Sequence, residues 1–321
     1  MDLEEQTLRY YLKVFSVTLI FILILSYLFI FTILNKNINL KNNSLSISKG
    51  ESIESIIKKN IYNISKLEIY FIKNYIKFKN LFNNKFIHYG DFFIQNNTSF
   101  LKLINIITKP SNILYKITII EGWSQKKLNI ELAKYFKDFY PIKYSSIIAD
   151  TYFFQKNSNF DLFIEKLKKN KSNYFIKKKN NKLLSNFSEK EIMIMGSLLE
   201  KEGLDDKDKK LISSVIFNRL NKKMKLQVDA TVIYSITKGN YDLNRKLLFS
   251  DLKIDDPFNT YFYRGLPPTP ISYVGKETLD ILFENYNSDF LFYFYNNSLN
   301  RHIFSKTFEE HKEKLNEFRN K

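Results

Sequence analysis

The most constraining feature of this sequence is the uncharged run VFSVTLIFILILSYLFIFTIL, from Val14 to Leu34. At about 1.5 Å per residue, a helix of this length measures about 30 Å, which matches the hydrocarbon thickness of a bilayer. A core helix of a soluble domain would keep a polar face, and this run has none. The sequence therefore predicts one transmembrane helix over 14–34.

We expect this helix to be retained. It is longer than the apolar core of a typical signal peptide, and Asn35-Lys36-Asn37 lacks the small residues that a signal peptidase requires. Basic residues flank the run on both sides, so the positive-inside rule assigns no orientation.

The charge balance of the chain is strongly basic. Fifty Lys and Arg against 33 Asp and Glu give a net charge of +17, which would ordinarily suggest nucleic acid or an anionic surface as a partner. The excess is spread along a chain rich in Asn, Ile, Phe and Tyr, with only 8 Gly and 6 Pro, and biased genome composition explains this pattern. A nucleic-acid binder would also need a recognition motif and a reason for the membrane span. We expect no nucleic-acid partner.

The chain has no cysteine, which excludes disulfides, thiolate nucleophiles and cysteine-ligated metals. Its three histidines, His88, His302 and His311, lack the spacing of a metal motif and are interpreted as structural or peripheral. We therefore expect no metal and no cofactor, and chemistry that rests on carboxylates, hydroxyls and amides.

The segment 35–46 is polar and Asn-rich, and predicts a short tether. Residues 47–115 predict a small αβ module, with one helix opening near Ser52, a strand at Phe92–Ile94 and a second helix opening at Ser99. Residues 116–321 mix helical patterns with β-branched runs. The predicted fold class is α+β.

A capping box, Ser188 followed by Glu191, predicts a helix that runs to Gly203. Gly196 and Ser197 lie four and three positions before Glu200, so Glu200 is expected to face a groove of small side chains. Such a groove would leave room for a ligand beside a carboxyl group that holds its proton.

A second amphipathic helix is expected over Leu211–Leu220, and it ends with Asn218 and Arg219. Farther on, Pro257–Tyr261 and Gly265–Ile271 are rich in Asn, Tyr and Pro. A rigid loop of this kind suits the wall of a sugar-binding cleft, because it presents polar edges and aromatic faces at little ordering cost.

Several motifs, taken in order, resemble those of one family. They are IIEGWS (119–124), ADTY (149–152), EKEG (200–203), FNRL (217–220), LQVDATVIY (226–234), FNTY (258–261), GLPPTPI (265–271) and HIF (302–304). On these motifs the chain resembles the endolytic murein transglycosylases, the YceG-like lytic transglycosylases, over essentially its whole length.

This resemblance implies an enzyme that cuts the MurNAc-GlcNAc β-1,4 bond within peptidoglycan strands and leaves 1,6-anhydro-MurNAc ends. One carboxyl group serves as acid and then as base, and no second carboxylate activates water. Glu200 is the expected catalytic residue on the motif and on its helix face. Glu202 is the rival, and could instead pair with Arg219.

The resemblance also implies an organisation and a location. Residues 1–13 would be a cytoplasmic N-terminus, 47–115 a LysM-like module, and 116–321 the catalytic domain facing the periplasm from the inner membrane. Peptidoglycan strands are the expected partner, together with cell-wall synthesis enzymes.

Other residues in the matched motifs carry groups suited to a sugar. The expected substrate-binding residues are Gln227, Asp229, Thr231, Tyr234, Asn259, Thr260 and Tyr261, with Asn218 and Arg219 in supporting, more structural roles.

Two other readings of the cleft remain open. In one, the protein is a membrane-anchored peptidoglycan-binding protein without turnover. In the other it is a hydrolytic muramidase that uses Glu200 with Asp229, and its products would carry free reducing ends.

Overall fold

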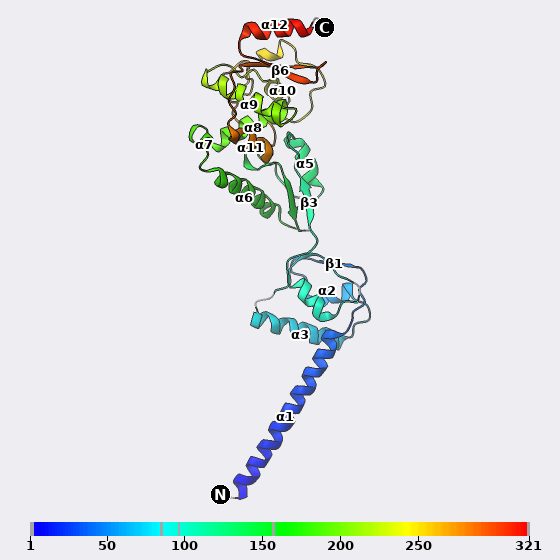
Figure 1. Cartoon of the computed structure of the whole chain (residues 1–321). Helices are drawn as coiled ribbons and strands as arrows, with labels where there is room; N and C mark the ends of the chain where they lie inside the picture. Colours follow the sequence, from blue (N-terminus) through cyan, green and yellow to red (C-terminus); the bar gives the residue numbers. More distant parts are fainter. Residues whose placement is uncertain (1–2, 84–85, 96, 156–157, 320–321) are drawn as a thin grey trace. The chain divides into compact units, whose positions relative to one another are not determined.

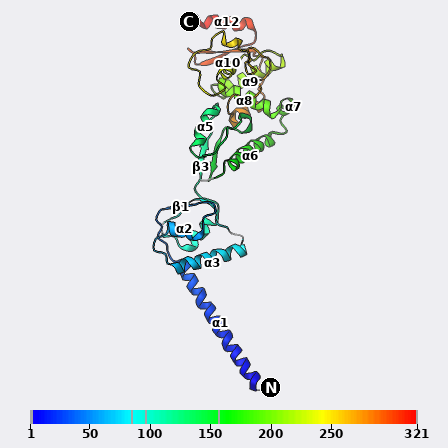
Figure 2. The same ribbon diagram turned by 180° about the vertical axis from the view of Figure 1, so that it is seen from behind.

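The computed structural model describes residues 3–83, 86–95, 97–155 and 158–319. The chain divides into two compact units (Figures 1 and 2), one of Met1–Tyr115 with Phe154–Asn157 and one of Lys116–Phe153 with Ser158–Lys321. Within the described ranges the strands pair as three two-stranded sheets, β1–β2, β3–β4 and β5–β6, among a larger number of helices. The predicted α+β class is confirmed.

The first unit is built from helices and one antiparallel sheet. Its elements are α1 (Leu3–Asn35), β1 (Ser44–Ile47), α2 (Ile53–Asn60), α3 (Lys66–Asn83), β2 (Gly90–Phe93) and α4 (Phe100–Ile107). Leu45 of β1 pairs with Phe92 of β2, and both side chains are buried in the core of the unit. Ser52 and Ser99 cap α2 and α4, which confirms the two predicted helix starts.

Residues 35–46 differ from the predicted tether. Ile38 is buried, its amide donates to the carbonyl of Thr98, and Leu40 forms a bridge with Ile61. Leu45, in β1, is also buried in the core of the unit. The many Asn residues of this segment concealed its contacts with the core in the sequence.

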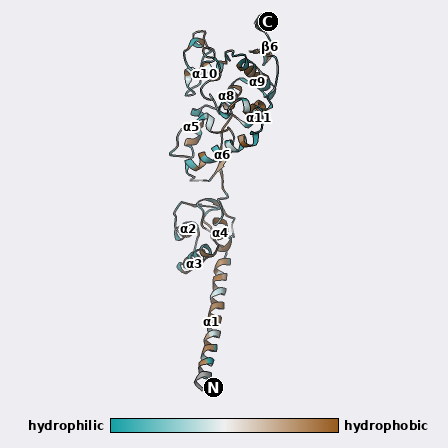
Figure 3. Cartoon of the chain, turned by 90° about the vertical axis from the view of Figure 1, so that its left-hand side faces the viewer, coloured by the Kyte–Doolittle hydropathy of each residue, from teal (hydrophilic) through white to brown (hydrophobic). Residues whose placement is uncertain are grey.

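The helix α1 includes the predicted span. Among the described helices it alone is long and apolar enough to cross a membrane, over Gln6–Asn35. Figure 3 shows it as mostly hydrophobic along its length, and most of its large apolar side chains are exposed. The helix over 14–34 is thus confirmed, and its crossing of a membrane stays a prediction.

The second unit contains most of the chain. Its strands are β5 (Phe292–Asn296), β6 (Arg301–Ser305) and all but one end residue each of β3 (Tyr115–Thr118) and β4 (Thr151–Phe154). Its helices are α5 (Gln125–Ala133), α6 (Phe160–Lys178), α7 (Leu183–Asn186), α8 (Glu189–Glu202), α9 (Asp206–Asn221), α10 (Asp229–Thr237), α11 (Lys276–Glu284) and α12 (Phe308–Arg319), with short 3₁₀ turns at Tyr144–Ser146 and Asp251–Lys253.

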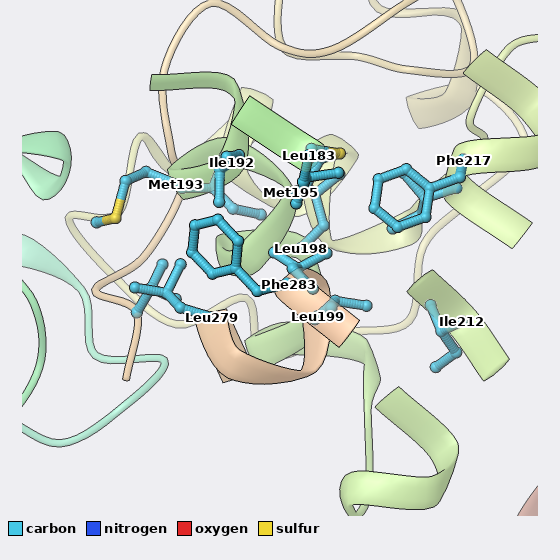
Figure 4. Close-up of a cluster of buried hydrophobic side chains, with 14 of the residues drawn as sticks. Leu183, Ile192, Met193, Met195, Leu198, Leu199, Ile212, Phe217, Leu279 and Phe283 are labelled. Atoms are coloured by element: carbon cyan, nitrogen blue, oxygen red, sulfur yellow. The ribbon is translucent and has the colours of Figure 1, made fainter. Parts of the chain in front are cut away.

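The core of this unit surrounds α8. Leu198 and Leu199 of α8 are fully buried among side chains of α9 and α11, and Figure 4 shows Ile212, Leu279 and Phe283 in this cluster. The predicted capping box is present, and α8 ends before Gly203 as expected. The second helix begins at Asp206, five residues earlier than predicted, because Asp205 caps it through the amide of Asp208.

Candidate active site

Glu200 and Glu202 lie two positions apart near the end of α8. At about 100° per residue, their side chains leave the helix on nearly opposite sides. The fold therefore gives the two carboxyl groups separate surroundings, although they belong to one short motif.

Glu200 is enclosed and fully paired. One of its oxygens lies 2.9 Å from Lys209 Nζ, and the other accepts the amide of Gly275 at 3.0 Å. Lys209 also donates to Thr278 Oγ1 at 2.7 Å, and only 3% of the Glu200 side chain is exposed. These contacts join α8, α9 and the start of α11, so Glu200 has the surroundings of a structural ion pair.

The open groove that we expected beside Glu200 is absent at Gly196 and Ser197, so that prediction is wrong. A Cβ at Gly196 would lie 2.6 Å from Val274 Cγ1, and Ser197 Oγ accepts the amide of Ile271 at 3.0 Å. Ser272 Oγ donates to the carbonyl of Ser197. The small side chains let the backbone of 271–275 approach α8 closely, and the space is filled.

Glu202 faces the other side of α8, where it is half-buried and has no cationic partner at ion-pair distance among the described residues. Its carboxyl oxygens accept long hydrogen bonds, at 3.4 Å each, from the amide of Ala230 and from the hydroxyl of Tyr293. Burial raises the pKa of Glu202, and the charge of Asp229 raises it further, against the opposing effects of the Ala230 amide, His302 and Tyr293. A carboxyl group in these surroundings holds its proton more tightly than a solvated one.

Two of the predicted residues lie beside Glu202. The hydroxyl of Tyr261 donates to Asp229 Oδ1 at 2.6 Å, and Asp229 is the exposed first residue of α10. Burial and the neighbouring Asp229 raise the pKa of Tyr261 well above its usual range, so its hydroxyl remains a donor at neutral pH. The structure therefore brings Glu202, Asp229 and Tyr261 together.

Arg219 is buried. It forms no ion pair with Glu202, which was the alternative role expected for Glu202 from the sequence. Its guanidinium donates to the carbonyls of Leu291 and Leu226, at 2.6 and 2.7 Å, and to Gln227 Oε1 at 3.2 Å. It thus ties the start of β5 to the turn that precedes α10. Asn218 donates its amide to two carbonyls just before β5, at 2.7 and 2.9 Å, so both residues join α9 to the segment that leads into β5.

Three predicted substrate residues are buried and satisfied internally. Thr231 Oγ1 lies 2.9 Å from Thr260 Oγ1, and Asn259 donates to the carbonyls of Leu252 and Ile254. They hold the loop of 257–261 against α10 and offer no free group to a ligand. Of the others, Gln227 is exposed and Tyr234 is half-buried, with its ring 4.7 Å from that of Phe258.

Tyr293 and His302 reach the same place from β5 and β6, and sequence reasoning did not identify them as site residues. The ring of His302 meets that of Tyr293 edge-on at 5.4 Å, and its Nδ1 lies 2.8 Å from Asp208 Oδ2. Tyr293 belongs to an aromatic run, FYFY, and nothing in this run marks one tyrosine as a site residue. The HIF motif was the available signal for His302, but its partner Asp208 lies 94 residues away.

The comparisons with known proteins agree with the motifs. Residues 45–317 match the model of the YceG-like family. The endolytic murein transglycosylase of Bacillus subtilis is 35% identical over 157 residues, which make up 49% of this chain and 38% of that protein. The protein of the same name from Streptococcus pneumoniae serotype 2 is 32% identical over 136 residues, 41% of this chain and 24% of that one. The chain thus spans less than two fifths of the length of either relative.

A solved structure shows the same fold. The crystal structure of a yceG-like protein from Listeria monocytogenes superimposes with a TM-score of 0.54 at 23% identity, over 84% of this chain and 98% of that one.

Proposed function

Because the chain belongs to the YceG-like family, we propose that it is an endolytic lytic transglycosylase that cleaves the MurNAc-GlcNAc β-1,4 bond within peptidoglycan strands. Two relatives that share about a third of their matched residues with it are named endolytic murein transglycosylases. The observation that carries the proposal is Glu202, a proton-holding carboxyl group beside the Tyr261–Asp229 pair.

We assign the catalytic role to Glu202 in place of Glu200. A general acid must reach the oxygen that it protonates, and Glu200 has both carboxyl oxygens engaged and a side chain that is only 3% exposed. Glu202 is half-buried, its hydrogen bonds are long, and burial favours its protonated form. The same motif therefore supplies one structural and one catalytic carboxylate.

In this mechanism Glu202 donates its proton to the glycosidic oxygen as the bond from that oxygen to C1 of MurNAc breaks. The C6 hydroxyl of the same MurNAc then bonds to C1, and its proton passes to the Glu202 carboxylate. The carboxylic acid is restored and no water is consumed. In this proposal Asp229, exposed beside Glu202, stabilises the positive charge that builds at C1.

The proposed organisation follows the family resemblance. We propose that α1 anchors the protein through residues 14–34, with 1–13 cytoplasmic, 47–115 as a LysM-like module and 116–321 as the catalytic domain facing the periplasm from the inner membrane. Peptidoglycan strands are the proposed partner, and cell-wall synthesis enzymes are further proposed partners.

Product analysis of intact sacculi tests the function. Mass spectrometry of the fragments should find anhydro-MurNAc ends with the natural chain and none with Glu202→Gln, which keeps the shape of the side chain and loses its proton. Glu200→Gln is the matched control and should still cleave at a temperature at which it is folded.

Other results would refute parts of the proposal. Free reducing ends would indicate a hydrolase, and binding of sacculi without any fragments would indicate a non-catalytic binding protein. Normal cleavage by Glu202→Gln together with loss of cleavage in Glu200→Gln would return the role to Glu200.

A further inference from the structure

The helix α3 has two apolar faces. Ile69, Ile72 and Ile76 point into the core of the first unit and are buried. On the opposite side of the helix, five large side chains are each 59–80% exposed: Leu67, Tyr70, Phe78, Leu81 and Phe82. A row of this kind is unusual on a surface that faces water, and it marks a contact with an apolar partner.

The position of α3 relative to α1 indicates which partner that is. The ring of Phe71 lies 5.3 Å from that of Phe29, and Lys36 Nζ lies 2.6 Å from Glu68 Oε1. Phe29 lies five residues before the end of the uncharged run, or about 7.5 Å along the helix axis. If α1 spans a bilayer, α3 is held at the boundary between hydrocarbon and headgroups. Figures 1 and 2 show α3 next to the C-terminal end of α1.

The charges on α3 suit that boundary. Lys66, Lys73 and Lys77 are spaced by seven and four residues, so they follow one edge of the exposed apolar face. Lysines at such an edge extend their ammonium groups to anionic headgroups while their stems cover apolar surface. Tyr70, on the same edge, is of the type enriched at membrane interfaces.

A groove of about 570 Å³ separates the two helices. Ile30, Phe31 and Leu34 of α1 form one wall, and Phe71 and Phe78 of α3 form the other. The α1 wall belongs to the uncharged run, so the groove opens at the depth of the acyl chains. Water would find few hydrogen-bond partners there.

We propose that α3 is an interfacial helix whose exposed apolar face inserts into the leaflet where the C-terminal end of α1 emerges, and that a lipid acyl chain fills the groove between α1 and α3. This inference rests on the proposed anchoring by α1. It adds a second membrane contact, which fixes the height and tilt of the first unit on the bilayer.

The absence of cysteine allows a direct test, because a single introduced cysteine carries the only label. Full-length Phe82→Cys is labelled with the environment-sensitive fluorophore NBD and reconstituted into vesicles of phosphatidylcholine and phosphatidylglycerol. Phe93→Cys on β2 is the matched control, since Phe93 is also an exposed phenylalanine of the first unit, and Phe21→Cys in α1 reports the span. Circular dichroism checks that each variant is folded.

Lipids that carry a spin label on the acyl chain quench NBD on contact. We expect quenching and a blue-shifted emission at positions 82 and 21, and neither at position 93. A label on Leu81→Cys should show the same quenching and blue shift as one on Phe82→Cys. Phosphatidylglycerol should increase the quenching and the blue shift at positions 81 and 82.

The outcomes separate this inference from the proposed function. In a density gradient the vesicles should float together with the bound protein. Vesicles that float and leave the protein behind would refute the anchor. A quenched label at 21 with an unquenched, water-exposed label at 82 would refute the interfacial helix alone. A blue-shifted label at 82 that spin-labelled lipid does not quench would also overturn it, because protein, such as a second copy of the chain, would then cover the face.

Discussion

The hydroxyl of Tyr261 donates a 2.6 Å hydrogen bond to Asp229, the residue immediately before the amide that contacts Glu202. The hydrogen bond holds the Asp229 side chain in place at the edge of the site. Because Tyr261 is uncharged, it does not neutralise the charge of Asp229. A carboxylate held in place this way makes ionisation of its neighbour Glu202 harder. The site thus combines one fixed anion with a neighbouring carboxyl group whose pKa is raised.

Removing the charge of Asp229 should shift the pH dependence of cleavage. In the proposed mechanism the first step needs protonated Glu202, so cleavage should slow as pH rises through the pKa of Glu202. Asp229→Asn lowers that pKa, because the charge of Asp229 raises it. The alkaline limb of the pH–rate profile should therefore move to lower pH. An unchanged limb with a lower plateau would indicate that Asp229 acts on the substrate alone.

Glu202→Gln should be more stable than the natural chain at neutral pH. The folded-state pKa of Glu202 is raised above its ordinary value of 4.5, so the folded protein holds this proton more tightly than the unfolded chain does. The stability that this proton confers is fully present below about 4.5 and is lost as pH rises through the folded-state pKa. Thermal unfolding of both proteins across pH should show curves that separate with rising pH. Parallel curves would contradict the raised pKa.

Glu200→Gln should lose stability with little change in pH dependence of cleavage. The variant leaves Lys209 without its charged partner in a largely buried place, at a cost of roughly 2–3 kcal/mol in the free energy of unfolding. Urea unfolding measures this loss. If Glu200→Gln were as stable as the natural chain, the ion pair would not hold α8 to α9 as described.

Gly196→Ala should destabilise the second unit by about 1–3 kcal/mol, because the new methyl group overpacks a filled core. It would lie 2.6 Å from Val274 Cγ1. Val274→Ala removes that atom, so the double variant should recover part of the loss that the two single changes would give together. Strict additivity in this cycle would show that the two positions are not in contact.

Local patterns predicted much of the fold. The capping box at Ser188 and Glu191, the serine caps of α2 and α4, and the uncharged run of α1 each depend on residues within one or two turns, and each is present. The 18-residue helix α3 was not predicted, because its two apolar faces obscure the helical period.

The site was harder to predict, because its contacts are distant in sequence. Spacing placed Glu200 beside small residues, but only the folded chain shows that the segment 271–275 fills that place. Thr231 and Thr260 are expected from the motifs to bind substrate, yet in the structure they bond to each other across 29 residues and are buried. The motifs identified the region of the site. Only the burial of each side chain in the structure shows which of them a ligand could contact.

The end of α8 at Gly203 has an effect on Glu202 as well. A Cβ at position 203 would lie 2.3 Å from a side-chain carbon of Lys209, so glycine allows the chain to turn there into α9. Glu202 is consequently the last helical residue, at the pole where unpaired carbonyls carry the negative end of the helix macrodipole. That pole disfavours a carboxylate, so the position of the helix end favours the protonated form that the proposed mechanism requires of Glu202.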